Sequence, residues 1–354
     1  MRIVFFIPAL HSMSGGLANI YAVARNLKAL GRQVALMGPD HNAAGLKEAA
    51  AEGLTLLPWG TELTSSDTWC VPESWPNAFS VGFNTGTKVL VYVQNWVYML
   101  GNLPQSVRWK QLPLEYLAVS RPVAWFMREV LALEAQAIVP PSIEGYFFQT
   151  GARPNSHVRV AFMSRKNRAL GEQIQQVASA CLAERAGAPR LEWVEIRNKT
   201  RAEVAELLSG CHLFMSTAFP EGFGLPPLEA MASGCVPVGF TGFGGWEYMR
   251  QCRVKRFWPQ GVIPIGGPAG PPYALPPSPQ GDPQSARGNG FFSADGDTLG
   301  AGLALAHAAC AAHENSEEWR ELCRSCRETA PVIAWTRKKR FWTAFFRQIP
   351  CEQS

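Results

Sequence analysis

No stretch of the 354-residue chain approaches the ~20 consecutive apolar residues that a membrane-spanning helix needs. Charged residues make up only 17% of the chain and the formal net charge is +5, so the dense positive charge typical of nucleic-acid-binding proteins is also lacking. The nine cysteines are odd in number and scattered, which indicates reduced thiols rather than a disulfide framework. We therefore expect a cytoplasmic protein, at most in peripheral contact with the inner face of the membrane.

What the chain does have is enough apolar material for a large core. Hydrophobic residues make up 47% of it, and its length corresponds to about two domains. Short apolar, β-branched runs alternate with longer amphipathic segments, a pattern typical of parallel strands joined by crossover helices. The clearest helix covers residues 16–30 and is ended by Gly31. The strands expected before residue 150 cover residues 3–7, 33–37, 54–57, 88–93, 117–119 and 137–139.

The same alternation restarts near residue 158. The elements expected there are strands at 158–163, 191–196 and 213–217 and helices at 170–185, 201–208, 298–312 and 317–330. Two successive α/β halves imply a cleft between them, so we expect one domain at 1–152 and a second at 153–332. Residues 251–289 interrupt the second half as an insertion too rich in proline and glycine for a helix or a central strand.

The stretch "FPEGFGLPPLEAMASGCVPVGF" places Glu221 and Glu229 on either side of a Gly-Phe-Gly turn, with seven residues between them. We expect a helix to begin near Leu225, because proline is tolerated in a first helical turn. The N-terminus of a helix attracts phosphate, and Gly222 and Gly224 let the backbone approach such a ligand closely. Carboxylates repel phosphate, so both acids are better suited to bind hydroxyl groups. A ligand with a diphosphate between hydroxylated rings is a nucleotide sugar.

The segment "EGFGLPPLEAMASGCVPV" resembles the Glu–seven residues–Glu motif of the retaining GT-B glycosyltransferases, specifically family 4, the group 1 glycosyl transferases. Further segments resemble that family in the right order: "SGGLANIYAVARNLKALGRQVAL", "LAVS", "AIVPPSIEGYFF" and "VAFMSRKN". The resemblance implies two Rossmann-like domains facing a cleft. The first domain would bind the acceptor and the second the nucleotide sugar, and a C-terminal helix at 333–354 would cross back to the first domain.

The resemblance also implies roles for individual residues. The catalytic set is Glu221, Arg165 and Lys166, and the donor-binding set is Glu229, Gly222, Phe223, Gly224, Leu225, Gly15 and Gly16. Glu221 would contact the transferred sugar near its reacting carbon, and Glu229 would hold the ribose. The amides of Gly224 and Leu225 would face the diphosphate. Arg165 and Lys166 would neutralise charge on the leaving diphosphate, with Arg168 as an alternative to one of them.

In the first half, the loop at 14–17 matches the glycine loop of the family, which would meet the diphosphate and the acceptor. His11 precedes this loop and is a candidate contact for the acceptor or the sugar. After the strand "KVLVYV" the family commonly has a histidine, whereas this chain has Gln94 and Asn95. Neutral amides can still bond a sugar hydroxyl, but they cannot perform a role that needs a titrating imidazole.

Two further patterns raise the question of a metal. In "ADGD", Asp297 directly precedes an expected helix, so we interpret it as an N-cap rather than as part of a metal-binding Asp-x-Asp. Cys323 and Cys326 form a lone C-x-x-C in a helical pattern, with no second pair nearby. We expect no metal and no cofactor, because the resemblance implies that helix amides and basic side chains take the place of a metal.

The expected activity is transfer of a sugar from a nucleotide-diphosphate sugar to an acceptor hydroxyl, with retention of anomeric configuration. The acceptor would be a glycan, a lipid-linked molecule or a small molecule, as in bacterial surface polysaccharide or glycoconjugate synthesis. A donor-binding module that has lost transfer and a sugar-nucleotide epimerase are the alternatives. The terminal segment "WTRKKRFWTAFF" either lies on an anionic membrane or packs its aromatics in the core.

Overall fold

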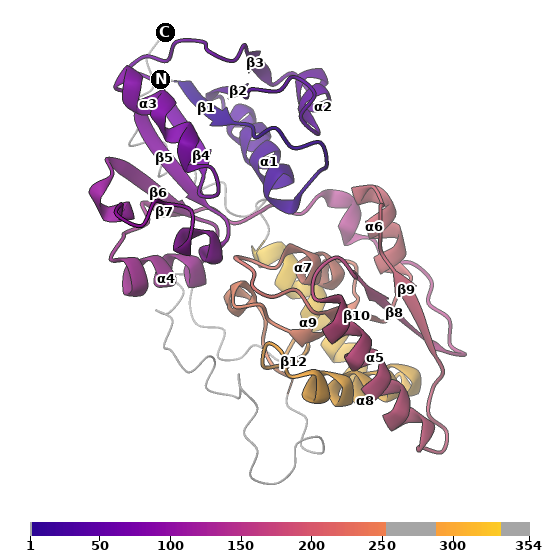
Figure 1. Ribbon diagram of the computed structural model, residues 1–354. Helices are drawn as coiled ribbons and strands as arrows, with labels where there is room; N and C mark the ends of the chain where they lie inside the picture. The colour runs from indigo at the N-terminus through magenta and orange to yellow at the C-terminus, as the bar shows by residue number, and fades with distance from the viewer. Residues whose placement is uncertain (1, 253–287, 334–354) are drawn as a thin grey trace. The chain divides into compact units, whose positions relative to one another are not determined.

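The computed structural model describes residues 2–252 and 288–333. These residues form two compact units, residues 2–142 and Ile143–Ile333, each of which contains one sheet (Figure 1). All strand pairs within both sheets are parallel. The expected α/β class, with two Rossmann-like domains, is therefore confirmed.

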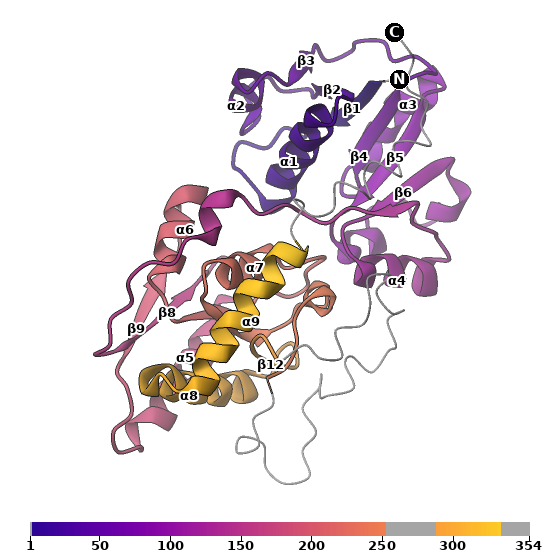
Figure 2. The same ribbon diagram turned by 180° about the vertical axis from the view of Figure 1, so that it is seen from behind.

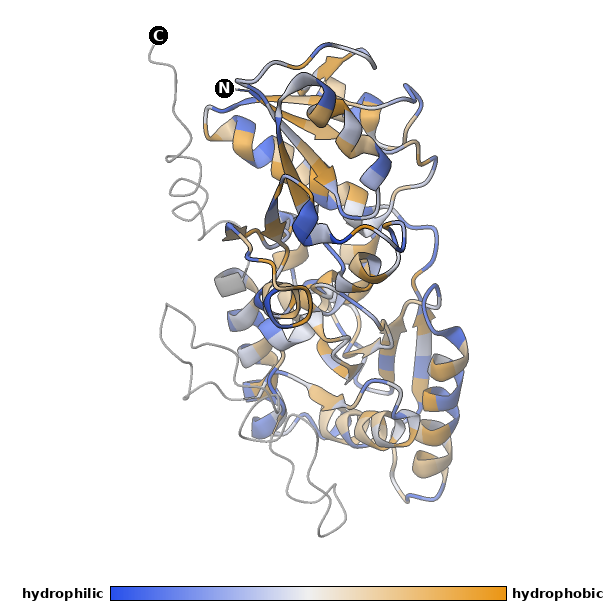
Figure 3. Cartoon of the chain, turned by 60° about the vertical axis from the view of Figure 1, so that its left-hand side comes forward, coloured by the Kyte–Doolittle hydropathy of each residue, from blue (hydrophilic) through white to orange (hydrophobic). Residues whose placement is uncertain are grey.

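The first unit is built on a seven-stranded sheet in the order β3-β2-β1-β4-β5-β6-β7. Its strands are β1 (Arg2–Phe6), β2 (Gln33–Met37), β3 (Thr55–Leu57), β4 (Thr68–Pro72), β5 (Lys88–Val93), β6 (Leu114–Ala118) and β7 (Ala137–Ile138). The central strands are almost continuously apolar and buried, because helices cover both faces of a parallel sheet (Figure 3).

Four α-helices and three 3₁₀ turns connect these strands. They are α1 (Gly15–Ala29), α2 (Leu46–Ala51), α3 (Phe79–Thr85), α4 (Arg121–Leu131), η1 (Pro76–Ala78), η2 (Trp96–Leu100) and η3 (Trp109–Gln111). Helix α1 begins where predicted, because the Ser14 side chain accepts a hydrogen bond from the Leu17 amide over 3.1 Å. Just beyond its end, Gly31 has a φ of 77°, a conformation that favours glycine.

Strand β4 is the one strand of the first sheet that the sequence analysis missed. It reads "TWCVP", all five residues are buried, and it pairs with β1 on one side and β5 on the other. The segment is short and ends in a proline, which normally indicates an edge strand or a turn. Here Pro72 is the last residue of the strand, so the residues before it keep the amide N–H groups that bond to the neighbouring strands.

The second unit contains a five-stranded sheet in the order β12-β11-β10-β8-β9. Its strands are β8 (Val158–Phe162), β9 (Leu191–Glu195), β10 (Leu213–Ser216), β11 (Val236–Phe240) and β12 (Phe291–Ser293). Its helices are α5 (Arg168–Ala183), α6 (Arg201–Ser209), α7 (Leu225–Ala232), α8 (Thr298–Glu314) and α9 (Glu317–Ile333), with η4 (Gly145–Phe148) and η5 (Gly244–Glu247). Helices α5 and α8 pack side by side, and α7 packs on α9 (Figure 2).

The division between the units falls ten residues earlier than the sequence analysis placed it. Residues 143–152, expected in the first domain, lie in the second unit because η4 packs on α6 and α7. The Ser233 hydroxyl at the end of α7 also donates a 3.0 Å hydrogen bond to the carbonyl of Phe147. The segment therefore contacts helices that follow it in the chain.

The structure does not describe two segments for which the sequence analysis made predictions. These are the expected C-terminal helix at 333–354, of which only Ile333 is described, and most of the insertion at 251–289. Among the described helices, none combines the length and apolar composition that a bilayer crossing requires.

Candidate functional site

Two loops at the carboxyl ends of neighbouring strands in the second unit bring a cation and a carboxylate together. Lys166 lies between β8 and α5, and Glu221 lies in the loop between β10 and α7. The Lys166 Nζ is 2.6 Å from the Glu221 Oε1, and the two side chains are 36% and 20% exposed. The structure thus places in contact two residues that were assigned to the catalytic set.

The Lys166 loop is held in place by its neighbour Asn167. This residue has a left-handed backbone, with a φ of 53°, and its side-chain Nδ2 donates to the carbonyls of Thr217 and Phe219 over 2.8 and 2.9 Å. Arg165 is exposed, and Arg168 is 72% exposed and pairs with Glu172 on its own helix. Lys166 is therefore the basic side chain of this loop that contacts Glu221.

A second glycine-rich loop, which the sequence analysis did not assign to the site, supports Glu221 from the other side. The Glu221 amide donates to the Gly242 carbonyl over 2.9 Å, and the Gly244 amide donates to the Glu221 carbonyl over 3.1 Å. A Cβ at Gly244 would lie 2.2 Å from the Phe223 amide nitrogen, so the two loops touch backbone to backbone. The signal for this loop was the sequence "TGFGG" directly after a strand.

Helix α7 begins at Leu225 as predicted, with Gly224 at its N-cap in a left-handed conformation. Its first turn offers few amides, because Pro226 and Pro227 carry no N–H. The Tyr248 hydroxyl donates a hydrogen bond to the Gly224 carbonyl. The helix terminus therefore offers an anion fewer backbone donors than the motif alone suggested.

Glu229 is 1% exposed and forms an ion pair with Arg201, the first residue of α6. The Arg201 Nη1 is 2.6 Å from the Glu229 Oε1, which has no other hydrogen-bond partner among the described residues. Arg201 also bonds Glu144 through Nη2 and Nε, at 2.5 and 3.3 Å, and its guanidinium lies 5.0 Å from the centre of the Phe147 ring. Desolvation raises the pKa of Glu229, and the charge of Arg201 opposes that rise.

This arrangement adds two residues to the site that the sequence did not indicate. Arg201 and Glu144 precede Glu229 by 28 and 85 positions in the chain, and no local motif connects them. Glu229, the residue expected to bind the ribose, is thus a buried carboxylate paired with Arg201 and is not open to solvent.

In the first unit, the structure brings Gly16 and Gln94 together. Gly15 and Gly16 are the first residues of α1, and a Cβ at Gly16 would lie 3.6 Å from the Gln94 Nε2. The Gln94 Oε1 accepts a 2.9 Å hydrogen bond from the Nδ2 of Asn19 on the same helix. Gln94 is partly exposed, whereas Asn95 is 8% exposed and its Oδ1 accepts from the Val97 amide as the N-cap of η2.

A buried carboxylate lies beneath these two amides. Glu73, which follows β4, is 1% exposed and accepts hydrogen bonds from the backbone amides of Gln94 and Asn95 over 3.0 and 2.9 Å. Burial raises the pKa of Glu73 to about 7, although both hydrogen bonds favour its charged form. His11 is 77% exposed and lies 3.7 Å from the Asp40 carboxylate, apart from this network.

The acidic residues of "ADGD" have structural partners. Asp297 caps α8 as predicted, because its Oδ1 accepts from the Gly300 amide over 2.8 Å. Asp295 accepts a 2.9 Å hydrogen bond from the Gly242 amide, which ties it to the loop beneath Glu221. Within residues 2–252 and 288–333, no group of three or more His, Cys, Asp or Glu side chains is arranged to hold a metal ion. Cys323 and Cys326 are buried on α9.

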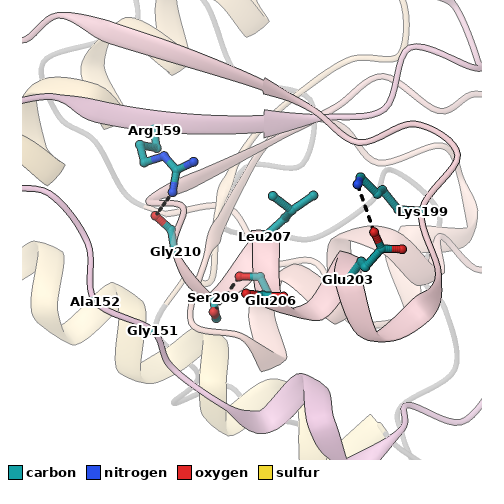
Figure 4. Close-up of a pocket in the computed structure, with 9 residues that line it drawn as sticks. All are labelled: Gly151, Ala152, Arg159, Lys199, Glu203, Glu206, Leu207, Ser209 and Gly210. Atoms are coloured by element: carbon teal, nitrogen blue, oxygen red, sulfur yellow. Dashed lines mark hydrogen bonds and ion pairs between the residues drawn. The ribbon is translucent and has the colours of Figure 1, made fainter.

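A pocket of about 390 Å³ lies beside α6 in the second unit (Figure 4). Its lining residues are Gly151, Ala152, Arg159, Lys199, Glu203, Glu206, Leu207, Ser209 and Gly210. Within it, Lys199 pairs with Glu203 at 3.0 Å, and none of the predicted site residues lines it. We assign no ligand to this pocket.

Parts of the chain are similar in sequence to known proteins. Residues 181–253, which include the Glu221–Glu229 stretch, match the model of the glycosyl transferases group 1. An alpha-1,6-glucosyltransferase from Actinobacillus pleuropneumoniae serotype 7 (strain AP76) is 26% identical over 185 residues. That match covers 51% of this chain and 55% of the relative, so the chain spans little more than half of the relative's length.

Solved structures of low sequence identity share the fold along nearly the whole chain. Sucrose-phosphate synthase from Thermosynechococcus elongatus aligns with a TM-score of 0.61 and 14% identity, over 98% of both chains. The pneumococcal O-GlcNAc transferase in complex with UDP and GlcNAc aligns with a TM-score of 0.58 and 10% identity, over 99% of both chains. These similarities identify the fold as GT-B.

Proposed function

We propose that the chain is a group 1 glycosyltransferase of the GT-B fold, and that it transfers a sugar from a nucleotide-diphosphate sugar to an acceptor hydroxyl with retention of anomeric configuration. The acceptor in this proposal is a glycan, a lipid-linked glycan or a small molecule. Because the matched relative is named a glucosyltransferase, glucose is the first sugar to test.

The contact between Lys166 and Glu221 is the observation that carries this proposal. Both residues lie at the carboxyl ends of parallel strands, where open α/β sheets bind their ligands. A diphosphate entering there would meet the ammonium of Lys166, and the hydroxyls of the sugar would meet the carboxylate of Glu221. The ion pair holds both side chains at the same place in the free protein.

In the proposed reaction, the bond between the anomeric carbon and the leaving phosphate oxygen breaks. A bond forms on the same face between that carbon and the acceptor oxygen, and the proton of the acceptor hydroxyl moves to the leaving phosphate. Lys166, with Arg165 beside it, stabilises the charge that develops on the diphosphate. Glu221 orients the sugar and forms no covalent bond with it. In this proposal Lys166 and Arg165 neutralise the negative charge of the diphosphate, which a metal ion would otherwise neutralise, so the proposal includes no metal.

Glu229 has a supporting role in the proposal, as the carboxylate that receives the ribose hydroxyls. Arg201 would keep it ionised in its buried position and fix the direction of its oxygens. The amide of Leu225 and the backbone of Gly222, Phe223 and Gly224 complete the donor site. Since two prolines follow Leu225, more of the diphosphate charge must be met by side chains.

The proposal is tested with the full chain and a panel of UDP-, GDP-, ADP- and dTDP-sugars that includes UDP-glucose. A rise in melting temperature identifies the donor, because a ligand that binds only the folded state stabilises it. Proton NMR of the product then reports the anomeric configuration, and an α-linked product from an α-linked donor shows retention. An inverted product contradicts retention, and the absence of both binding and turnover across the panel contradicts the proposed activity.

The variant Glu221→Gln tests the role of this carboxylate, because it keeps the shape of the side chain and removes its charge. We expect turnover to fall much more than donor affinity, since Glu221 acts on the reacting sugar. Unchanged turnover would remove Glu221 from the mechanism while leaving the activity itself intact.

A further inference from the structure

A chain of hydrogen bonds in the first unit fixes which way the side-chain amide of Gln94 faces. It runs from the Val139 carbonyl to the Tyr92 hydroxyl at 2.5 Å, from that hydroxyl to the Asn19 Nδ2 at 2.8 Å, and from Nδ2 to the Gln94 Oε1 at 2.9 Å. All four residues belong to the first unit. The chain begins in the core and ends at a partly exposed side chain.

The direction of each bond follows from the first one. A carbonyl oxygen can only accept a hydrogen bond, so the Tyr92 hydroxyl must donate its one proton to the Val139 carbonyl. The Tyr92 oxygen can then only accept from its other neighbour, which requires the amino group of Asn19 to face it. The second proton of that amino group points to Gln94, which must present its oxygen.

The amino group of Gln94 is thereby directed away from Asn19. Its Nε2 makes no hydrogen bond to any residue that the structure describes, and it lies beside Gly16 in the first turn of α1. Burial raises the pKa of the Tyr92 hydroxyl, so that hydroxyl keeps its proton and the direction of the chain does not change over the physiological pH range.

Burial of the Asn19 side chain destabilises the fold. It is 5% exposed, and its Oδ1 has no hydrogen-bond partner among the described residues. A buried acceptor left unpaired destabilises a fold, so an apolar side chain would suit this position better if packing were its only task. The backbone beyond β5 is fixed independently, because Glu73 accepts from the amides of both Gln94 and Asn95.

We propose that Gln94 is a hydrogen-bond donor to a sugar oxygen, and that Asn19 is the positioning residue that sets this polarity. This inference rests on the proposed function, because it takes the ligand of the first unit to be a sugar. A ligand group at this place must accept, as a hydroxyl oxygen or a ring oxygen does.

The polarity is tested first, by hydrogen exchange at side-chain amides in the ¹⁵N-labelled full chain. The two resonance pairs are identified by their disappearance in Gln94→Glu and Asn19→Leu. We expect slow exchange for the buried, bonded amino group of Asn19 and rapid exchange for that of Gln94. A protected Gln94 amino group beside a rapidly exchanging Asn19 amino group would overturn the proposal. This measurement needs no substrate, so it stands or falls separately from the proposed activity.

The ligand is tested next, by adding UDP, UDP-glucose, other sugar nucleotides and methyl α-D-glucopyranoside in separate titrations. A shift of the Gln94 amino resonances with a sugar nucleotide but not with its nucleotide alone assigns the contact to the transferred sugar. A shift with the glucoside alone assigns it to the acceptor. No shift with any of these compounds overturns the sugar contact, whatever the exchange experiment shows.

Variants then separate donor from acceptor character at this position. Gln94→Glu keeps the oxygen that receives the Asn19 bond but offers the ligand only a second acceptor, so we expect the KM for the contacted sugar to rise at least tenfold. Gln94→Met, which removes the donor without adding charge, should raise it similarly. Gln105→Glu is the matched control, since it adds the same charge at an exposed position of the same unit. Equal KM values in Gln94→Glu and Gln105→Glu would contradict the proposal.

Discussion

The Nζ of Lys166 lies 2.6 Å from the Oε1 of Glu221, although the two residues are 55 positions apart in the chain. Each belongs to a loop that follows a strand, and β8 and β10 are neighbours in the sheet. The pair is partly exposed, so its contribution to the free energy of unfolding is small, about 0–1 kcal/mol. The pair therefore contributes little to the stability of the second unit.

We expect Lys166→Met to lower kcat by about 10²- to 10³-fold, as is typical when one group that stabilises transition-state charge is removed. The melting temperature should change little, because the ion pair is exposed to solvent. Steady-state kinetics with the identified donor provide the measurement. Lys199→Met is the matched control, since Lys199 forms a similar exposed pair with Glu203 in the same unit. Equal loss of activity in both variants would refute a specific role for Lys166.

Arg201→Met should destabilise the second unit by about 3 kcal/mol, because it leaves the Glu229 carboxylate buried without its cation. Denaturant unfolding measures this change. The double variant Arg201→Met/Glu229→Gln should recover much of the loss, since no charge then remains in the interior. If the double variant is as unstable as the single one, lost packing on Phe147 explains the effect instead.

The Arg201→Met variant should also show a stronger pH dependence of stability than the unmodified protein. Burial raises the pKa of Glu229, and a raised folded-state pKa means that stability is greatest below the ordinary carboxyl range and falls as the pH rises. Without Arg201 this rise in pKa becomes larger, so the decline with pH should be steeper than in the unmodified protein. Unfolding curves recorded from pH 4 to 8 would show a parallel decline in both proteins if Arg201 had no such effect.

Gly244→Ala should disturb the loop that carries Glu221. The added Cβ would lie 2.2 Å from the Phe223 amide nitrogen, so the backbone must move, at a cost of about 1–3 kcal/mol. We expect a lower melting temperature together with weaker donor binding, measured by thermal shift. Gly145→Ala is the control, because its Cβ would meet nothing within 4 Å. Similar stability of the two variants would show that the loops separate easily.

Glu73→Gln should flatten the pH dependence of stability in the first unit. Burial raises the pKa of Glu73 to about 7, so the unmodified protein should lose about 3 kcal/mol of stability between pH 4.5 and 7 through this residue. Glutamine does not ionise and removes that slope. The nearby Cys70 and Tyr92 also have pKa values raised by burial and stay neutral over this range. Equal slopes in both proteins, measured by urea unfolding at several pH values, would contradict the assignment.

Local patterns in the sequence were sufficient where the structural cause is local. The start of α7 at Leu225 and the N-cap at Asp297 were both predicted, because a cap depends on residues within one turn. The Glu221–Glu229 stretch was found for the same reason. The roles given to its residues remain predictions.

What the sequence did not reveal depends on residues distant in the chain. The partners of Glu229 come from α6 and from the segment before η4, and their meeting is a result of tertiary packing. The polarity of Gln94 depends on Asn19 and Tyr92, which no spacing rule connects. Strand β4 was missed because its burial between β1 and β5 outweighs the weak signal of a five-residue segment ending in proline.

The two prolines in the first turn of α7 affect how firmly an anion can be retained. Added salt weakens the attraction between an anion and buried backbone amides only slightly, whereas it readily screens the attraction of exposed ammonium and guanidinium groups. If a diphosphate binds as proposed, mainly to the side chains of Lys166 and Arg165, we expect its dissociation to become easier as ionic strength increases.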